Sequence, residues 1–433
     1  MPGDFPSAVL AEAEEAARRP LPSDVTDLRA VPFRTLDPVG ARDLDQAYAI
    51  EETSDGFVVR YAIAHVAHFV EPGGAVDAEA HRRGVTIYLP GERAPLHPPV
   101  LSEGAASLLP GVDRPALVWT IEVPGGGTRV ERALVCSREQ LAYDTAVDPV
   151  LERVGEVLLA EEAARGGVAL DLPAQEVVAV DDRLTLRVDP VLPIERWNAQ
   201  LSLLTGRAAA TLMLDGGVGI LRTMPPPDDG VVRELRRLAR ALDIPWADGE
   251  SYAAVVRRVD RGSVRGVVFL QHARRAMRGA GYTAFDDGTR PALREHSAVA
   301  APYAHVTAPL RRLADRYALE VCLALCAGVE VPAWVRAALP RLPEVMGAAM
   351  RKAAAVERAV IDEVEAMLLS RCVGAVLDAT VVSVDGDTAV VAVDAPVVVA
   401  NARSASAWAP GDRVGVRVVA ADVSRRHVEL AAA

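Results

Sequence analysis

The hydrophobic pattern of this chain changes twice along its length, and the order of the patterns constrains the fold more than any other feature. Between residues 34 and 135, segments such as 57–64 and 116–123 show the alternating apolar residues of β-strands. A helical period then dominates to about residue 370, with long stretches at 146–165, 194–214, 229–242, 308–327 and 342–370. A sheet followed by many helices predicts an α+β domain.

Near the C-terminus the pattern returns to short strands. Apolar runs at 374–384 and 388–393 flank a turn centred on Gly386, which is typical of a tight hairpin. Two further runs follow at 414–420 and 425–430. This part of the chain is therefore predicted to be a small all-β domain.

The N-terminal residues read as a short lead-in. One helix is expected over residues 7–19, because the prolines that follow it end a helix. We therefore expect three parts: a helical lead-in over 1–30, the α+β domain over 31–370 and the all-β domain over 371–433.

The charge, the arginine content and the cysteines bear on the possible partners and on the cellular location of the protein. The net charge of −12 is unusual for a nucleic-acid binder, although an internal channel can carry a local field of the opposite sign. Of the 47 basic residues all but Lys352 are arginine, which binds phosphate well, but a GC-rich genome explains the same usage. The four cysteines form no C-x-x-C pair, and no signal-like or membrane-length apolar run is present. We expect a cytoplasmic protein with no membrane association.

Residues 35–47 hold an unusual concentration of aspartates. Asp43 and Asp45 are two apart, so on an extended segment their carboxylates leave the same face, and Asp37 precedes a bend that can turn its carboxylate toward them. Crowded carboxylates repel one another unless a cation lies between them, and such hard oxygen ligands suit magnesium or manganese. A solvated acidic loop would have a similar sequence, but the apolar residues on both sides indicate that this loop is anchored to buried structure.

The aspartate run resembles the signature D-P-x(4)-D-x-D-D of the ribonuclease II (RNB) family of exoribonucleases. Further blocks that resemble this family follow in the same order, at 63–70 (expected to be a strand), 80–90, 107–114, 296–300 and 303–312. The correspondence spans roughly residues 27 to 365. Several separate blocks in the right order make coincidence an unsatisfactory explanation.

The resemblance implies an α+β RNB catalytic domain, with a mixed β-sheet and surrounding helices, followed by a five-stranded OB-fold barrel that binds RNA. It implies a metal-dependent 3′-to-5′ hydrolytic exoribonuclease that degrades single-stranded RNA processively to nucleoside 5′-monophosphates, with Mg²⁺ or Mn²⁺ as cofactor. It further implies single-stranded RNA as the partner of a monomer. Members usually carry two small cold-shock-type barrels before the catalytic domain, and thirty residues cannot hold even one of them, so we expect these barrels to be lacking.

The family pattern also implies roles for individual residues. Asp43, Asp45 and Arg311 are expected to be catalytic, and Arg311 would clamp the scissile phosphate. The metal ligands would be Asp37, Asp43, Asp45 and Gln46. The residues expected to bind RNA are Tyr88, which would stack on the 3′-terminal base, and Arg311, Arg312, Arg275, His305, Arg425 and Arg426.

Two departures from the family pattern leave alternatives open. Gln46 replaces an acidic residue, and the stretch 197–206 lacks two glutamates that the family often has. A catalytically weakened RNA-binding protein that keeps the fold is therefore an alternative, and a phosphodiesterase acting on small nucleotides or DNA is a third. The barrel region contains Trp408 as its only aromatic residue, so it is expected to contact the RNA backbone through arginines or only to support the channel. His65 and His68 are expected on opposite faces of a strand, with structural roles.

Overall fold

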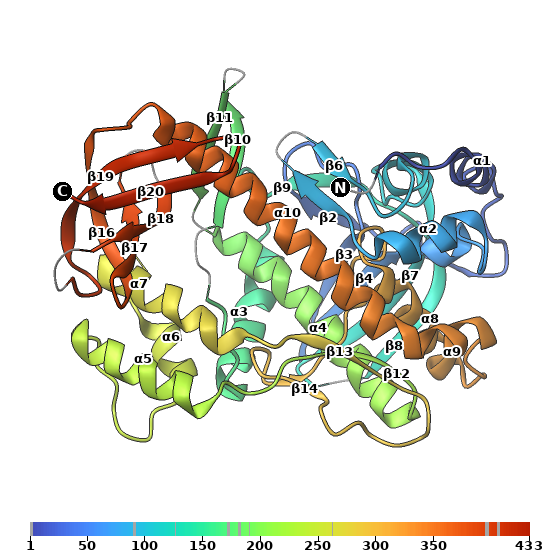
Figure 1. Cartoon of the computed structure of the whole chain (residues 1–433). Coiled ribbons are helices and arrows are strands. Elements are labelled where there is room, and N and C mark those ends of the chain that lie inside the picture. Colours follow the sequence, from blue (N-terminus) through green and yellow to red (C-terminus); the bar gives the residue numbers. More distant parts are fainter. Residues whose placement is uncertain are drawn as a thin grey trace.

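The computed structural model of the chain describes residues 3–89, 92–125, 127–170, 174–180, 183–189, 191–261, 263–394, 398–404 and 408–433. It has a large α+β part and a small C-terminal β-barrel, and the long helix α10 (Leu342–Ser370) runs from one to the other (Figure 1). This arrangement confirms the predicted order of an α+β domain and an all-β barrel.

The main sheet has seven strands in the order β1-β8-β7-β4-β3-β2-β9. Neighbouring strands are antiparallel except for the pairs β1–β8 and β2–β9, which are parallel, so the sheet is mixed as predicted. The strands are β1 (Thr26–Asp27), β2 (Arg34–Asp37), β3 (Gln46–Thr53), β4 (Gly56–Ala64), β7 (Asp113–Val123), β8 (Thr128–Cys136) and β9 (Glu139–Ala142).

Both faces of this sheet are buried, which explains why its central strands are apolar on both sides. On β4, Tyr61 and Ile63 pack into a core with α3 (Pro149–Arg165), α4 (Pro193–Gly216) and α8 (Leu313–Ala327). The alternate residues Ala62 and Ala64 face a second core that includes α1 (Ser7–Ala16) and α2 (Ala75–Arg83). The sheet is therefore fixed between two layers, and its edges and loops are where a site can form.

The remaining elements are short or lie at the periphery. Four two-stranded pairs are β5 (Ile87–Leu89) with β6 (Glu92–Ala94), β10 (Ala174–Val180) with β11 (Arg183–Asp189), β12 (Gly219–Thr223) with β13 (Gly281–Phe285), and β14 (Glu295–His296) with β15 (Ala301–Pro302). The other helices are η1 (Val66–His68), η2 (Leu101–Ala105), α5 (Asp229–Ala241), α6 (Tyr252–Arg258), α7 (Val264–Ala273), η3 (Arg274–Met277), α9 (Ala333–Ala338) and η4 (Leu339–Arg341).

Helices α5, α6, α7 and η3 share a small core of their own, and they lie below the barrel in Figure 1. The barrel is closed, with the strand order β16-β17-β18-β20-β19. Its strands are β16 (Val376–Asp385), β17 (Thr388–Val393), β18 (Val398–Arg403), β19 (Arg413–Asp422) and β20 (His427–Ala432). Gly386, at φ 58°, makes the predicted turn between β16 and β17 possible, because that backbone conformation is costly for other residues. The strand pattern had not indicated β18.

Three predicted boundaries are wrong. The strand expected over 63–70 ends at Ala64 and gives way to the 3₁₀ turn η1, which places the rings of His65 and His68 on neighbouring positions, 6.1 Å apart. The helix expected from residue 308 begins only at Leu313, because the segment before it is used in the site described below. Helix α1 ends at Ala16 rather than at residue 19.

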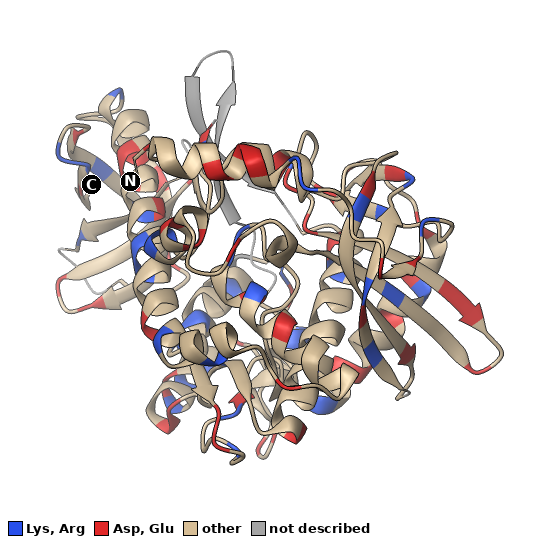
Figure 2. Ribbon diagram, turned by 90° about the vertical axis from the view of Figure 1, so that its right-hand side faces the viewer, with Lys and Arg blue, Asp and Glu red and all other residues tan. Residues whose placement is uncertain are grey.

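Acidic and basic residues are mixed over the whole ribbon rather than separated into two halves (Figure 2). Among the described residues, no helix has the length and apolar character that crossing a membrane requires.

Candidate active site

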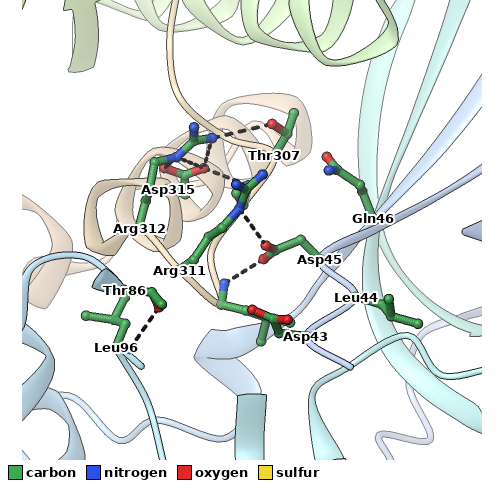
Figure 3. Close-up of polar contacts among 12 residues, drawn as sticks. Asp43, Leu44, Asp45, Gln46, Thr86, Leu96, Thr307, Arg311, Arg312 and Asp315 are labelled. Atoms are coloured by element: carbon green, nitrogen blue, oxygen red, sulfur yellow. Dashed lines mark hydrogen bonds and ion pairs between the residues drawn. The ribbon is translucent and has the colours of Figure 1, made fainter. Parts of the chain in front are cut away.

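Asp45 is the centre of the site. It lies just before β3 and its side chain is 2% exposed. Oδ1 accepts a hydrogen bond from the backbone N–H of Leu310 at 2.7 Å, and Oδ2 accepts one from Nε of Arg311 at 3.2 Å (Figure 3). The aspartate loop and the segment before α8 are far apart in the sequence, and this carboxylate joins them.

The loop that carries the aspartates is anchored as the flanking apolar residues predicted. Leu44 is fully buried, and its N–H donates to Oγ of Ser107 at 3.0 Å. The same hydroxyl donates to the carbonyl of Arg42 at 2.6 Å, and the N–H of Leu108 donates to the carbonyl of Leu44. These bonds fix the backbone on both sides of Asp43, so the loop is not a free, solvated one.

Asp37 and Asp45 both have strongly raised pKa values. Burial raises the pKa of Asp45 to about 7, although the positive charge of Arg311 opposes the shift. Burial also raises the pKa of Asp37 to about 6, with a further contribution from the nearby negative charge of Asp43. Oδ2 of Asp37 is buried and has no hydrogen-bond partner among the described residues. At both carboxylates, burial therefore outweighs the positive charge of Arg311, which favours the ionised form.

Asp43 has two partners that the family pattern had not paired with it. Oδ1 accepts from Nη1 of Arg93 at 2.5 Å, and Oδ2 accepts from the hydroxyl of Tyr88 at 3.2 Å. Arg93 also forms an ion pair with Glu103 at 2.7 Å. The Tyr88 ring, 51% exposed, is thereby held at the edge of the aspartate cluster. Sequence reasoning missed Arg93, which belongs to no quoted motif.

The donor set fits a hard divalent cation in its chemistry. Asp37, Asp43 and Asp45 supply carboxylate oxygens, and the buried oxygen of Asp37 that has no partner among the described residues suits a cation ligand. Two of the three carboxylates are paired with arginines, Asp43 with Arg93 and Asp45 with Arg311. In the described part of the chain, no group of three or more His, Cys, Asp or Glu side chains is close enough to hold a metal ion. The predicted ligand side chains therefore lie near one another, but their oxygen atoms do not surround a single point.

Gln46 lies beside this cluster, but its amide oxygen is already used. Oε1 accepts from the hydroxyl of Tyr61 at 2.9 Å and from Oγ of Ser202 at 3.4 Å. The two hydroxyls are also 2.9 Å from each other. Ser202 comes from α4, in the stretch that lacks the family's two glutamates, so a neutral network occupies the place next to the aspartates. The absence of those glutamates was the only sequence signal for it.

Helix α4 reaches this position because it packs closely on the segment that follows β15. At Gly206 a Cβ atom would lie 2.2 Å from Cε2 of Tyr303 and 2.6 Å from the carbonyl oxygen of Ala304, so only glycine fits. Earlier in the same helix, the side chain of Asn198 donates to the carbonyl of Leu36, directly before Asp37. The helix thus holds both the aspartate loop and the segment leading to Arg311.

Arg312 is the N-cap residue of α8 and points away from Asp45. Its guanidinium donates to both oxygens of Asp315, at distances of 2.8–3.2 Å, and reaches Oγ1 of Thr307 at 3.5 Å (Figure 3). The negative charge and hydrogen bonds of Asp315 hold the pKa of Arg312 above its usual range against the opposing effect of burial. Arg311, by contrast, is 43% exposed. Of the two predicted phosphate ligands, Arg311 is the one presented to the site, and RNA binding by Arg312 stays a prediction.

The other predicted RNA-binding residues are spread over the molecule. His305 is partly buried, with Nδ1 2.7 Å from the hydroxyl of Tyr282, and burial holds its pKa well below the usual range. Arg275 is exposed on η3. On the barrel, Arg425 pairs with Asp422, and Arg426 pairs with Glu363 of α10. The structure does not bring these residues into the aspartate cluster.

Comparison with known proteins agrees with this arrangement. The RNB domain model matches residues 25–325, and a model of the RNase II-type exonuclease C-terminal S1 domain matches residues 375–433. Ribonuclease R of Thermotoga maritima is 27% identical over 357 residues, which are 72% of this chain and 48% of that protein. Ribonuclease R of Aquifex aeolicus is 28% identical over 357 residues, 73% of this chain and 49% of that protein. The chain spans no more than about half the length of these curated relatives.

Solved structures show the same fold at low sequence identity. The apo form of Mycoplasma genitalium RNase R has a TM-score of 0.86 and 18% identity, with 98% of this chain and 75% of that chain covered. Yeast Ssd1, described as a pseudonuclease, has a TM-score of 0.69 and 18% identity, with 89% of this chain and 51% of that chain covered. Since the RNB model covers well over half of the chain and an RNase II-type S1 domain follows it, this protein belongs to the RNB-domain family.

Proposed function

We propose that this chain is a metal-dependent exoribonuclease that removes nucleoside 5′-monophosphates processively from the 3′ end of single-stranded RNA. The observation that carries the proposal is the pairing of buried Asp45 with the Leu310 amide and the Arg311 guanidinium, beside Asp37 and Asp43. An ionisable oxygen cluster next to an exposed guanidinium suits the cleavage of a phosphodiester.

Arg311 would bind the scissile phosphate. Its Nε is held by Asp45, so the orientation of its guanidinium is fixed, and its other N–H groups make no hydrogen bond to the described residues. These groups can therefore donate to phosphate oxygens and stabilise the charge that develops on them. Asp45 acts on the same reaction by positioning this arginine.

Asp37, Asp43, Asp45 and Gln46 are the residues that would hold the cation, which we propose is Mg²⁺ or Mn²⁺. A bound divalent cation supplies activation of water and stabilisation of the leaving 3′ oxygen. Burial disfavours the ionised forms of Asp37 and Asp45, and a cation beside them would offset that cost in competition with the proton.

Tyr88 would stack on the base at the 3′ end. Its ring is half exposed while its hydroxyl is held by Asp43, so the ring has a fixed orientation at the edge of the site. An aromatic face accepts any base, which suits degradation without sequence preference. Single-stranded RNA is accordingly the proposed substrate and partner; the monomeric state and the cytoplasmic location stay predictions.

A second candidate is an RNA-binding protein with weakened catalysis. The observation that favours it is the Tyr61–Gln46–Ser202 network, which adds no negative charge and occupies the amide oxygen of Gln46. A fourth ligand of this kind would bind a cation weakly. Yeast Ssd1, described as a pseudonuclease, has a related fold, so this fold is compatible with loss of the activity.

The test is a gel time course with a 5′-labelled single-stranded RNA of roughly 30 nucleotides in Mg²⁺ and in Mn²⁺. The Asp45→Asn variant and a DNA strand of the same sequence serve as controls. We expect a ladder that shortens from the 3′ end of the RNA to a small limit product, with no shortening by the variant. RNA that is bound but stays intact with both metals would favour the second candidate, and equal degradation of DNA would point to a general phosphodiesterase.

A further inference from the structure

Helix α5 presents a row of arginines on one face. They lie at the helical spacing i, i+3, i+4, i+7, so their side chains leave the same side of the helix. The opposite side buries Leu235 and Ala239 in the small core shared with α6, α7 and η3. We name this row the α5 arginine face, and it consists of Arg233, Arg236, Arg237 and Arg240.

Three members of the α5 arginine face have no partner in the part of the chain that the structure describes. Arg233, Arg237 and Arg240 are exposed and form no hydrogen bond or ion pair with any residue in the described ranges. The two acidic residues of α5, Asp229 and Glu234, form no ion pair with them either. Like charges gathered on one helix face repel one another, which costs stability in the absence of an anion.

Several arginines elsewhere in the molecule pair with carboxylates. Arg93 forms ion pairs with Asp43 and Glu103, and Arg316 forms an ion pair with Asp77. In a chain with a net charge of −12, acidic partners are plentiful. On α5, by contrast, three neighbouring arginines of one helix face have no carboxylate partner among the described residues, so the positive charge gathered there is not offset locally.

The α5 arginine face also has a defined shape. Its four arginines line a shallow hollow of about 400 Å³. Arg236 is fixed on one side of it, because its guanidinium lies 4.6 Å over the ring of Trp246 and Nη2 donates to the carbonyl of Glu250 at 3.0 Å. The hollow is thus lined by one guanidinium with fixed partners and three exposed ones without a partner among the described residues, which leaves those three available to anionic groups.

The surroundings of α5 point to a nucleic acid as the occupant. The helix leads into Leu242, whose Cδ2 would lie 3.2 Å from a Cβ at Gly411 of the barrel, so α5 adjoins the RNase II-type S1 domain. The neighbouring η3 carries Arg274 and Arg275, both exposed and also without a partner among the described residues. The exposed arginines of α5 and η3 thus lie in a helical part of the molecule that adjoins a domain of a type found in exonucleases.

We propose that the α5 arginine face binds the phosphate backbone of an RNA strand outside the active site, upstream of the 3′ end. The inference rests on the proposed function for the identity of the strand. From Arg233 to Arg240 the helix rises about 10.5 Å at 1.5 Å per residue, so several phosphates of one strand can lie along it. Arginine contacts of this kind carry no sequence information, so the surface would raise affinity for any sufficiently long RNA.

The test uses the full chain with the triple substitution Arg233→Gln, Arg237→Gln and Arg240→Gln. Arg236 is kept because it packs on Trp246. All proteins also carry Asp45→Asn, so the RNA stays intact during the measurement. The binding result is therefore independent of whether the wild type has the proposed nuclease activity. Fluorescence anisotropy gives the dissociation constant for labelled RNAs of about 6 and about 30 nucleotides over a series of salt concentrations.

We expect the triple variant to bind the longer RNA at least tenfold more weakly, with an unchanged affinity for the shorter one. The slope of log K against log salt should fall by about 2 for three lost phosphate contacts to a single strand. The matched control removes three exposed, individually paired arginines elsewhere, by Arg18→Gln, Arg129→Gln and Arg290→Gln. It carries the same change in net charge, so it separates a local contact from a general charge effect.

Two outcomes would overturn the proposal. One is an unchanged affinity and salt slope of the triple variant for the longer RNA, in which case an acidic protein surface would be the better occupant. The other is an equal loss in the matched control, which would reduce the effect to net charge. Equal melting temperatures of the three proteins show that folding is not the cause of any difference.

Discussion

At the residue scale, the site depends on carboxylates that burial makes reluctant to ionise. Asp45 is fully enclosed, and its pKa of about 7 lies above the ordinary value of an aspartate because desolvation outweighs the attraction of Arg311. A raised pKa of an acid means that the folded state binds the proton more tightly than the unfolded state. The resulting stability is fully present below about pH 4 and is lost as the pH rises toward 7.

Replacing Asp45 by asparagine should therefore flatten the pH dependence of stability. A shift of three pKa units corresponds to about 4 kcal/mol at most. In metal-free buffer, the free energy of unfolding should therefore fall between pH 4 and pH 8 by up to this amount more in the wild type than in the variant. Denaturant unfolding at both pH values measures the difference. Parallel stability curves for the two proteins would show that Asp45 is already ionised in the folded state at low pH.

Gln46 is the second residue with a clear expectation. The substitution Gln46→Asp would place a fourth carboxylate beside Asp45, while its shorter side chain gives up the hydrogen bonds to Tyr61 and Ser202. We expect a higher affinity for Mg²⁺, by about tenfold, because an added anionic ligand strengthens a hard-cation site, together with a lower melting temperature in metal-free buffer. Titration calorimetry with Mg²⁺ checks the affinity, and Gln46→Asn serves as the control that shortens the side chain without adding charge.

At the element scale, α10 holds the barrel through a buried acidic residue. Glu365 is 7% exposed, and its Oε1 accepts from the N–H of Val399 in β18 at 3.2 Å. Burial raises the pKa of this carboxyl to about 7, and the nearby charge of Asp362 adds to the shift. The contact between α10 and the barrel is thus favoured at low pH and weakens as the pH rises from about 4.5 to 7.

The substitution Glu365→Gln should remove this weakening. The amide oxygen of glutamine can accept the same hydrogen bond, and its side chain stays neutral at every pH. We expect the variant to be more stable than the wild type at pH 8 by about 1 to 2 kcal/mol and to have the same stability at pH 4. Thermal melting at the two values measures this, and a variant that is less stable at pH 8 would contradict it.

At the scale of the whole molecule, the chain has several separate cores, and α10 takes part in more than one of them. Its first half buries Leu342 and Met346 in the core of the α+β part, whereas Val364 and Leu369 pack in the barrel core. Segments that share a core open together. The end of α10 should therefore behave as part of the barrel, not as part of the helix that precedes it.

Native-state hydrogen exchange tests this division. The amides of residues 364–369 should exchange with the same free energy of opening as the barrel strands, and with a different one from the amides around Met346. Measuring exchange at increasing denaturant concentrations resolves the two groups. One common opening energy along the whole of α10 would show that the helix, and not the core, is the cooperative unit.

Much of this architecture could be predicted from the sequence because it depends on local pattern. The apolar runs of β4 and β7, the helical period of α4 and α10, and the hairpin around Gly386 each reflect short-range rules of backbone geometry and burial. The aspartate run stood out for the same reason, since its spacing and its apolar flanks lie within a single segment.

The partners of those aspartates were set by the tertiary structure. The contacts of Asp45 with the segment before α8, of Asp43 with Arg93, and of Gln46 with Ser202 join positions that no local rule connects. The early end of β4 and the late start of α8 have the same origin, because the backbone near the site is used in contacts across the fold instead of continuing a regular element. The sequence by itself determined which chemical groups the protein has and which elements carry them. Only the tertiary structure decided which of those groups meet, because side-chain contacts, burial and the resulting pKa shifts depend on packing between segments that lie far apart in the chain.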